Sequence, residues 1–257
     1  MKQTILLLAF LALGLAACLP LATPLPPLPT ATPPAPTASA TATIVWFPPT
    51  ATPTPLPSVT LSITPTLDLS PRYGALLLAD DFGETSEWSA GRSPAGSMTF
   101  GQGELTLAVS QGRGYLSSLR HGTSLGDFYL EINASPGICR AADEYGLLLR
   151  VASVQDFFRF ALLCNGQARL DRILGGQASS PVPPKPNAAV PPGAPSTSRL
   201  AVWASGKEMR FYANGQYLFS VRDGTLLSGG LGVFARAAGD GAVTINFSDL
   251  AVYQIAP

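Results

Sequence analysis

From residue 73 onward the chain alternates short runs rich in Leu, Val, Phe, Tyr and Thr with clusters of Gly, Asn, Asp and Ser. The turn signals recur at intervals of about eight to twelve residues, which is typical of an all-β sandwich. No stretch of this region has a helical period. The expected strands are Leu76–Phe82, Ser97–Phe100, Glu104–Val109, Gly114–Leu119, Phe128–Ala134, Tyr145–Val151, Phe157–Cys164, Gln167–Leu174, Arg199–Ala204, Glu208–Ala213, Gln216–Val221, Gly230–Ala235 and Val243–Ile255.

Two Asn-Gly pairs predict tight hairpins. Asn165-Gly166 and Asn214-Gly215 each lie between strand-like runs, and Asn-Gly supplies the two positive-φ residues of a type I′ turn. A third hairpin is expected through residues 152–156. The strand pairs predicted in this way are 157–164 with 167–174, 208–213 with 216–221, and 145–151 with 157–164.

The N-terminus has the pattern of a secretory signal. Met1-Lys2 precedes a charge-free run, Ile5–Ala17, which is shorter than the roughly 20 residues that a bilayer span needs. The end of this run, Leu15-Ala16-Ala17-Cys18, resembles the lipobox of bacterial lipoproteins. This resemblance implies that residues 1–18 form a lipoprotein signal peptide and that Cys18 is lipidated. The protein would then be extracytoplasmic and anchored to the bacterial membrane by lipid. The alternative is an ordinary signal peptide with a chance cysteine.

A Pro/Thr-rich tract follows, and residues 19–72 are expected to form a disordered linker. Proline fixes its own φ and removes a hydrogen-bond donor, so repeats such as Thr52-Pro53-Thr54-Pro55 favour extended polyproline II over a packed core. Residues 73–257 form the expected globular domain. A second Pro-rich segment, between Gly175 and Ser198, predicts a mobile surface loop within it.

Charge and cysteine content narrow the partners and the compartment. Net charge is +0 and only 12% of residues are charged, which indicates no electropositive surface for nucleic acid. With Cys18 assigned to lipid, Cys139 and Cys164 remain as a pair outside the cytoplasm, where disulfides persist. We predict a Cys139–Cys164 disulfide. Metal binding by these two cysteines is the weaker alternative, because zinc sites normally need four ligands.

The C-terminal third carries a resemblance to a known family. Arg210–Gln216, Gly229–Phe234 and Ile245–Tyr253 look like the end of concanavalin A-like lectin/glucanase domains, a jelly-roll group that includes laminin-G-like modules. Asp80-Asp81-Phe82 and Tyr145–Arg150 look like the first strand and the middle hairpin of the same group. The resemblance implies a two-sheet antiparallel jelly-roll sandwich in which the first and last strands are adjacent. It says little about activity.

The sequence assigns no catalytic residue. Glycosidases of this group carry a Glu-x-Asp-x-x-Glu type of strand, and none is present here. The close acidic pairs, Asp80-Asp81 and Asp143-Glu144, are adjacent residues, and adjacent residues on a strand point to opposite faces. The 3-keto-disaccharide hydrolase domains share the general layout, but their acidic centre has no match. A glycoside hydrolase-like enzyme therefore remains the alternative rather than the first reading.

Two further motifs have structural explanations. Gly122–Gly126 fits the Gly-x-Ser-x-Gly string around Ser124, but His121, the only histidine, lies upstream, so a glycine-rich turn is favoured. Asp80 or Asp81 could approach Asp249 at a calcium site between the first and last strands, but calcium needs six to eight oxygen ligands. We favour a hydrogen-bonded Asp249 in a bulge and assign no metal and no cofactor.

The middle hairpins supply the candidate ligand site. The expected pairing places Arg150, Arg169 and Asp171 with Phe158, Phe160 and Leu162 on one face, although a register slip of one residue would exchange the faces. Arg150, Arg169 and Asp171 form the preferred polar cluster for extracellular carbohydrate or a cell-surface polymer, although a structural salt-bridged surface patch is the favoured explanation of these residues. Trp88, Trp203 and Tyr115 are expected to be core or rim aromatics. A structural protein-interaction module is the third functional hypothesis.

Overall fold

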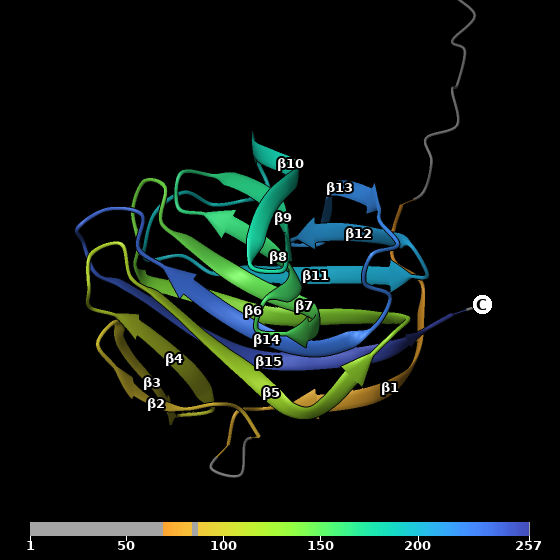
Figure 1. Ribbon diagram of the computed structural model, residues 1–257, viewed down its shortest axis with the longest axis horizontal. Helices are drawn as coiled ribbons and strands as arrows, with labels where there is room; N and C mark the ends of the chain where they lie inside the picture. The colour runs from red at the N-terminus through yellow and green to blue at the C-terminus, as the bar shows by residue number, and fades with distance from the viewer. Residues whose placement is uncertain (1–68, 84–86, 257) are drawn as a thin grey trace, which may run out of the picture. The chain divides into compact units, whose positions relative to one another are not determined.

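The computed structural model describes residues 69–83 and 87–256, and in that part every regular element is a β-strand (Figure 1). No helix in this part is long and apolar enough to cross a membrane. The predictions about the signal peptide, Cys18 and most of the Pro/Thr-rich linker lie outside the described residues.

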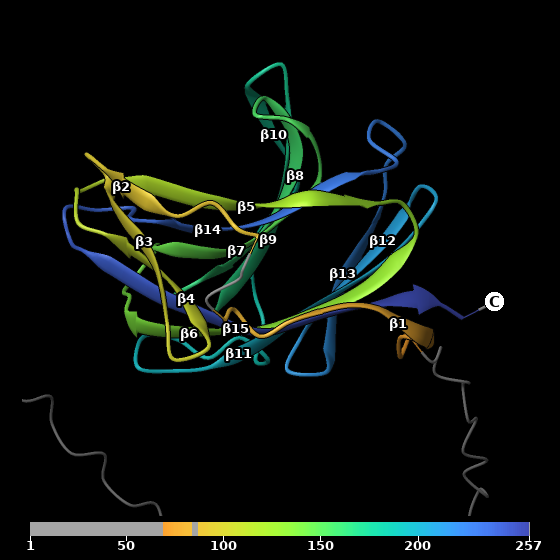
Figure 2. The same cartoon turned by 90° about the horizontal axis from the view of Figure 1, so that it is seen from below.

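The strands form two antiparallel sheets, which confirms the predicted two-sheet sandwich. Seen from below, the sheets are two layers, with β5 and β14 above and β6, β11 and β15 below (Figure 2). The nine-stranded sheet, called sheet A here, has the order β13-β12-β11-β6-β15-β4-β3-β2, with β1 also paired to β15. Its strands are β1 (Tyr73–Asp80), β2 (Gly91–Ser93), β3 (Gly96–Gly101), β4 (Glu104–Val109), β6 (Phe128–Ile138), β11 (Ser198–Ser205), β12 (Glu208–Ala213), β13 (Gln216–Arg222) and β15 (Val243–Ile255).

The second layer is a six-stranded sheet, called sheet B here, with the order β10-β9-β8-β7-β14-β5. Four of its strands follow one another along the chain and form a meander. The strands are β5 (Tyr115–Leu125), β7 (Glu144–Ser153), β8 (Asp156–Leu163), β9 (Gln167–Leu174), β10 (Gln177–Pro186) and β14 (Gly229–Arg236).

The first and last strands are neighbours, as the resemblance implies. β15 pairs with β4 through its first half, from Val243 to Phe247, and with β1 through its second half, from Leu250 to Ile255. The last strand therefore lies in the middle of sheet A and fixes the start of the domain to its end.

All three predicted hairpins are present, but one has a different turn. Asn214 and Gly215 both have positive φ, 51° and 75°, and close the β12–β13 hairpin as a two-residue turn. Between β8 and β9 only Gly166 has positive φ, and Leu163 pairs with Gln167 across three turn residues. A three-residue loop with glycine in the left-handed region satisfies the same backbone twist, so the strand pair is right although the turn type is not.

The hydrophobic core lies between the inner faces of the two sheets. Phe160 of β8 contacts Phe211 of β12 with ring centroids 4.8 Å apart, and Phe219 of β13 contacts Phe211 at 5.0 Å. Phe160 and Phe211 are both fully buried. Aromatic pairs of this kind add about 0.5–1.5 kcal/mol each beyond the burial of their area.

The register of the middle strands decides which face is the core. Leu147, Phe160 and Leu170 are directly opposite one another, and all three are fully buried. Cross-strand partners share a face, so Phe158, Phe160 and Leu162 point inward, while Arg159, Arg169 and Asp171 point outward. The predicted grouping of Arg169 and Asp171 with the phenylalanines was wrong.

The second Pro-rich segment is a strand over part of its length and not the predicted loop. β10 pairs with β9 at the edge of sheet B, with irregular register on both sides of Val182. Proline lacks an N–H donor but is tolerated on edge strands and at bulges. Val182 is buried opposite Leu170, and Val190 beyond the strand joins the core. Apolar residues between the prolines therefore hold this segment on the domain.

A disulfide joins Cys139 to Cys164 with their Cα atoms 5.9 Å apart. This confirms the predicted pair, and the spacing lies within the range for disulfides. The bridge ties the connection after β6 to the turn after β8.

Candidate functional site

The structure brings together two of the three predicted ligand residues. Arg169 and Asp171 form an ion pair on the outer face of sheet B. Asp171 also accepts hydrogen bonds from Arg159 Nη2 at 2.7 Å and from Ser180 Oγ at 2.6 Å. Its side chain is fully buried beneath these donors.

The carboxylates of this outer face are fully engaged by arginines. Glu144 pairs with Arg169 and with Arg236, each at 3.3 Å, so Arg169 joins Glu144 to Asp171. Burial alone raises the pKa of Asp171, but the hydrogen bonds from Ser180, Arg159 and Arg169 outweigh it and hold the pKa below its usual range. A general acid needs a raised pKa. This arrangement corresponds to the structural salt-bridged patch that was the favoured explanation of Arg169 and Asp171.

Arg150 lies apart from this network. Its φ is +49°, at an irregularity in the pairing of β7, and its side chain is 1% exposed. Its guanidinium donates to the carbonyl oxygens of Leu226 at 2.9 Å and Gly126 at 3.3 Å. Burial lowers the pKa of Arg150. Arg150 therefore links β7 to the segment between β5 and β6 and to the segment between β13 and β14. Its buried side chain is not accessible to a ligand.

The pairing of β1 with β15 places Asp80 opposite Leu250, next to Asp249, but the two carboxylates make separate hydrogen bonds. Asp80 accepts hydrogen bonds from the backbone N–H of Phe82 and from Trp88 Nε1, both at 2.9 Å. Asp249 has φ +53° in a bulge and accepts a hydrogen bond from Asn133 Nδ2. Among the described residues no group of three or more His, Cys, Asp or Glu side chains could hold a metal ion.

The Gly-x-Ser-x-Gly string falls within a strand. Ser124 belongs to β5, and Gly122 has φ +66°. A nucleophile elbow requires a turn from a strand into a helix, which is absent over the described ranges 69–83 and 87–256. His121 instead lies 3.3 Å from Ser89 Oγ. The structure therefore assigns this motif neither to an elbow nor to the expected turn.

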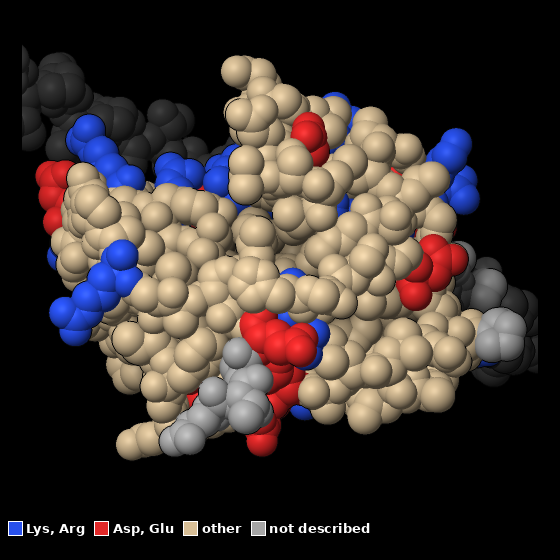
Figure 3. Space-filling model, turned by 60° about the horizontal axis from the view of Figure 1, so that its bottom comes forward, with Lys and Arg blue, Asp and Glu red and all other residues tan. Residues whose placement is uncertain are grey.

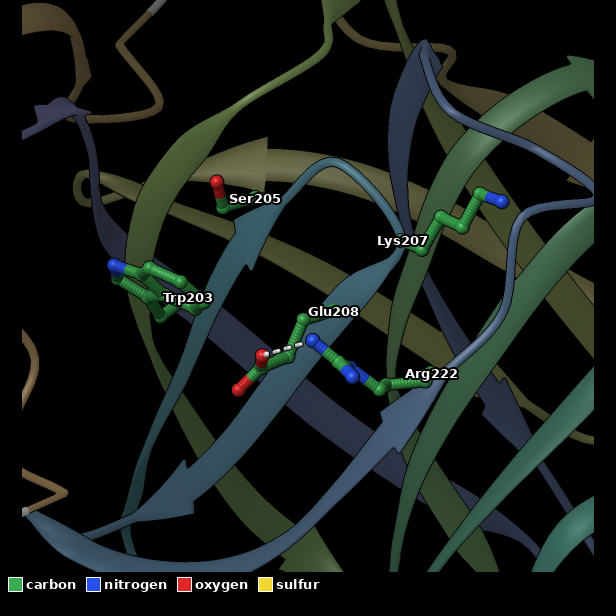
Figure 4. Close-up of a pocket in the computed structure, with 5 residues that line it drawn as sticks. All are labelled: Trp203, Ser205, Lys207, Glu208 and Arg222. Atoms are coloured by element: carbon green, nitrogen blue, oxygen red, sulfur yellow. Dashed lines mark ion pairs between the residues drawn. The ribbon is translucent and has the colours of Figure 1, made fainter.

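A pocket of about 530 Å³ opens on the outer face of sheet A, where β11, β12 and β13 meet (Figure 4). Strand alternation builds it: Ser205 pairs with Glu208, and Glu208 pairs with Arg222, so their side chains leave the same face. The lining residues are Trp203, Ser205, Lys207, Glu208 and Arg222.

The pocket combines an aromatic ring with planar polar groups. The Arg210 guanidinium lies 4.4 Å from the centre of the Trp203 ring, and its Nε donates to Glu208 Oε1 at 2.7 Å. This hydrogen bond raises the pKa of Arg210. Arg222 lies 3.8 Å from the other Glu208 oxygen, as Figure 4 shows. Glu208 thus holds the Arg210 guanidinium against the Trp203 indole, while the Arg222 guanidinium stays mainly exposed to solvent.

Aromatic residues continue from the pocket across sheet A. Trp203 is opposite Tyr129 on β6, and Tyr129 is opposite Tyr253 on β15. Tyr73, at the start of β1, stacks on Tyr129 with ring centroids 4.5 Å apart. We call these four residues the aromatic row. Tyr73 is 47% exposed, so the row has an accessible aromatic at its end away from the pocket.

The chain that precedes β1 borders this row. Tyr212 Oη donates to the carbonyl oxygen of Leu69 at 2.6 Å, and the Ala256 N–H donates to Arg72 at 3.5 Å. Figure 1 shows this segment in orange, passing β12 and β11 on its way to β1. Tyr129, Ala201 and Tyr212 form a buried cluster on the outer face of the sheet. One side of the aromatic row is therefore closed by the start of the domain itself.

Sequence patterns did not point to this pocket, because Trp203 was expected to be a core or rim aromatic rather than a platform for a ligand. Trp88 is in the core and is 4% exposed, and Tyr115 is 36% exposed on β5. Trp203, by contrast, is partly exposed on an outer face. The useful signal was the alternation of Trp203, Ser205, Glu208 and Arg210 on both sides of a two-residue turn, with small or apolar residues between them.

Charged groups are sparse on the face of the molecule shown in Figure 3. Most of it is uncharged, and isolated basic side chains are scattered near its edges. That face therefore has no continuous basic surface of the kind that binds nucleic acid.

Comparison with known proteins shows similarity of fold. The sequence matches no family model and no curated protein. A structure reported with endo-acting O-glycanases of the human gut microbiota, which initiate mucin breakdown, has TM-score 0.55 and 12% identity, and the match covers 71% of this chain and 100% of that one. A Bacillus subtilis protein of unknown function with a galectin-like fold has TM-score 0.53 and 15% identity, over 73% and 100%. The catalytic domain of a Thermotoga petrophila endo-1,3-beta-glucanase (laminarinase) has TM-score 0.51 and 10% identity, over 73% and 100%. The fold is thus a jelly-roll sandwich shared with galectin-like and glycoside hydrolase domains.

Proposed function

We propose that this domain binds extracellular glycan or a related surface polymer without cleaving it, through the pocket beside Trp203. The observation that carries the proposal is the combination of a partly exposed indole with Glu208 and Arg222 in one open pocket of about 530 Å³. Pyranose rings present C–H faces that stack on aromatic rings, and their hydroxyl groups match planar donors and acceptors. The fold, which is shared with glycan-active proteins, is consistent with this ligand class but does not by itself establish it.

The site belongs on sheet A rather than at Arg169 and Asp171. In the sheet B network each carboxylate already accepts hydrogen bonds from arginines, so a ligand would have to displace buried ion pairs. Breaking a buried pair by removing one partner costs about 3–5 kcal/mol. At the sheet A pocket, Lys207 and most of Arg222 face solvent, and a ligand can bind without breaking the fold.

The proposed place of action is outside the cytoplasm. The Cys139–Cys164 disulfide supports an oxidising compartment, and the N-terminal pattern supports export with lipid anchoring at Cys18. The Pro/Thr-rich linker would then hold the domain away from the membrane, where polymers of the cell surface or the surroundings are accessible.

Hydrolysis is the less favoured alternative. Two carboxylates of sheet B, Glu144 and Asp171, share Arg169, but both are buried under arginines and the pKa of Asp171 is lowered. A retaining or inverting glycosidase needs one carboxyl group that stays protonated near neutral pH. The lowered pKa of Asp171 favours its carboxylate form, which does not suit the role of general acid.

The test is glycan-array binding of the purified protein, followed by titration of each hit. Trp203→Ala should weaken binding at least tenfold, since aromatic residues at the centre of a binding site contribute about 2 kcal/mol or more. Tyr115→Ala is the matched control, because it removes an exposed aromatic from the other sheet. An array with no hits, or equal binding by Trp203→Ala and the parent, would refute the site. Release of reducing sugar from a bound glycan would refute the non-catalytic assignment.

A further inference from the structure

Two cationic side chains line the pocket of sheet A and a third lies beside it. Lys207 lies in the turn between β11 and β12, Arg222 ends β13, and Arg210 lies over Trp203. The three residues belong to the two successive hairpins β11–β12 and β12–β13, and the pairing of these strands brings their charges close together.

The carboxylates near the pocket are fewer than the cations. Glu208 pairs with both Arg210 and Arg222. Two other carboxylates lie at this turn. Asp127 accepts from the Gly206 N–H at 2.7 Å, and the Asp223 N–H donates to the Lys207 carbonyl oxygen at 2.7 Å. The Asp223 carboxylate is paired with Arg172, which leaves Glu208 and Asp127 beside the three cations. Lys207 has no ion pair within the described part of the chain. The chain as a whole has net charge +0, so the excess of positive charge at the pocket does not reflect a basic protein overall.

The cations are also available to a ligand. The Arg222 side chain is 83% exposed, and its contact with Glu208 is long, at 3.8 Å. Lys207 is exposed, and Figure 4 shows its ammonium at the rim, directed away from Trp203, with the Arg222 guanidinium directed toward Glu208. A guanidinium can donate two parallel hydrogen bonds to a carboxylate or sulfate, while a lysine acts as a mobile point charge.

Among the described residues, the other cavities do not combine several cations with an indole; the one beside Arg140, of about 270 Å³, is otherwise lined by Ile138, Cys139 and Ala242. Three arginines on the outer face of sheet B, Arg159, Arg169 and Arg236, are each bound to Asp171 or Glu144. Arg150 is buried and donates to backbone carbonyls. The groove over β14, of about 90 Å³, is lined mainly by apolar side chains such as Leu119 and Leu148.

We infer that the ligand of this pocket is an anionic glycan, in which one sugar ring packs on the part of Trp203 that Arg210 leaves exposed and an acidic substituent binds Arg222 and Lys207. This inference rests on the proposed function and adds the class of ligand. The acidic substituent is the shared chemistry of uronic-acid and sulfated sugars. Glu208 would accept hydrogen bonds from sugar hydroxyls and keep Arg210 in place.

The experiment compares acidic oligosaccharides with their neutral parents. Full-length protein is titrated with an oligogalacturonate and its carboxyl-reduced form, and with a sulfated galactan and its desulfated form. The acidic member should bind at least tenfold more tightly, and this preference should vanish in 1 M salt, where the Debye length falls to about 3 Å. The two pairs of probes separate a carboxylate from a sulfate as the preferred group.

Two substitutions assign the effect to residues. Lys207→Gln and Arg222→Gln should each weaken binding of the acidic member about fivefold and leave the neutral parent unchanged, because an exposed ion pair contributes up to about that factor. Lys185→Gln on β10 and Arg113→Gln, whose side chain is 80% exposed, are the matched controls and should change nothing.

The outcomes separate this inference from the proposed function. Equal binding of acidic and neutral members, both lost in Trp203→Ala, would overturn the inference and keep the proposed function. Acidic binding that is lowered equally by Lys185→Gln and Lys207→Gln would indicate non-specific attraction and would also overturn it. Failure of all four probes, with no glycan bound on the array, would overturn both.

Discussion

Asp171→Asn should be the most destabilising charge removal in the domain. The Asp171 carboxylate is fully buried and accepts hydrogen bonds from Arg159, Arg169 and Ser180. Asparagine fills the same space but removes the charge, and its amide group faces the guanidinium donors. Removing one partner of a buried pair costs about 3–5 kcal/mol. Since the two arginine side chains are 14% and 19% exposed, water can partly compensate, and we expect a loss near 3 kcal/mol.

The pH dependence gives a second readout of the same substitution. The folded-state pKa of Asp171 is lowered, so its contribution to stability is fully present above its unfolded pKa of about 3.9 and is lost as pH falls through the folded value. The difference in unfolding free energy between the parent and Asp171→Asn should therefore be full at pH 7 and should shrink below about pH 4.

Urea unfolding at pH 7 and pH 3 measures both effects, and thermal unfolding at pH 7 should show a decrease of about 6–12 °C. Asp240→Asn is the matched control, because the Asp240 side chain is 92% exposed and lies 3.9 Å from Arg113. A difference below about 0.5 kcal/mol, or one that stays constant from pH 7 to pH 3, would refute the view that this network holds the outer face of sheet B together.

Two further substitutions test the disulfide and the close contact between β7 and β8. The double substitution Cys139→Ser and Cys164→Ser removes a disulfide with a sequence separation of 25. It should lower the free energy of unfolding by about 3.5 kcal/mol, because the unfolded chain gains conformational entropy. Equal urea midpoints for the oxidised parent and the double mutant would contradict this. Gly146→Ala should destabilise by about 3 kcal/mol or more, because φ is +155° and a Cβ there would overlap the Phe160 carbonyl oxygen. Gly101→Ala, which meets no atom within 4 Å, is its control, and similar melting temperatures for the two variants would exclude the clash.

The fold could be predicted because its signals are local and repeated. Apolar alternation identified most strands, and turn residues such as Asn214-Gly215 fixed neighbouring pairs without any knowledge of distant contacts. The segment around Val182 was misread because proline is a local signal for a loop, whereas its place on an edge strand depends on the open edge of β9. Only the tertiary structure supplies that partner.

The candidate site was harder to predict because it depends on register. Sequence patterns correctly placed Arg169 and Asp171 on the same face of a strand. They did not identify the residues opposite them, because a register shift of one position exchanges the two faces of a strand. Arg150 was misplaced for a related reason, since the positive φ at this residue interrupts the alternation on β7. Trp203 and Arg222 are distant in the sequence and become neighbours only through two successive hairpins.

Under the proposed function, the two outer faces of the sandwich separate stability from recognition. On sheet B the charges of Asp171 and Glu144 are buried and satisfied by arginines, so they are costly to disturb and inaccessible to a ligand. On sheet A, Glu208 is shared between two arginines and Arg222 is 83% exposed, so a ligand can bind without disrupting the core. The similar structures share only 10–15% identity with this chain and show the fold alone, so the proposed function assigns the choice of ligand to these outer side chains. Substitutions at Arg222 or Lys207 should therefore change affinity and leave the unfolding free energy unchanged, whereas substitutions at Asp171 should do the reverse.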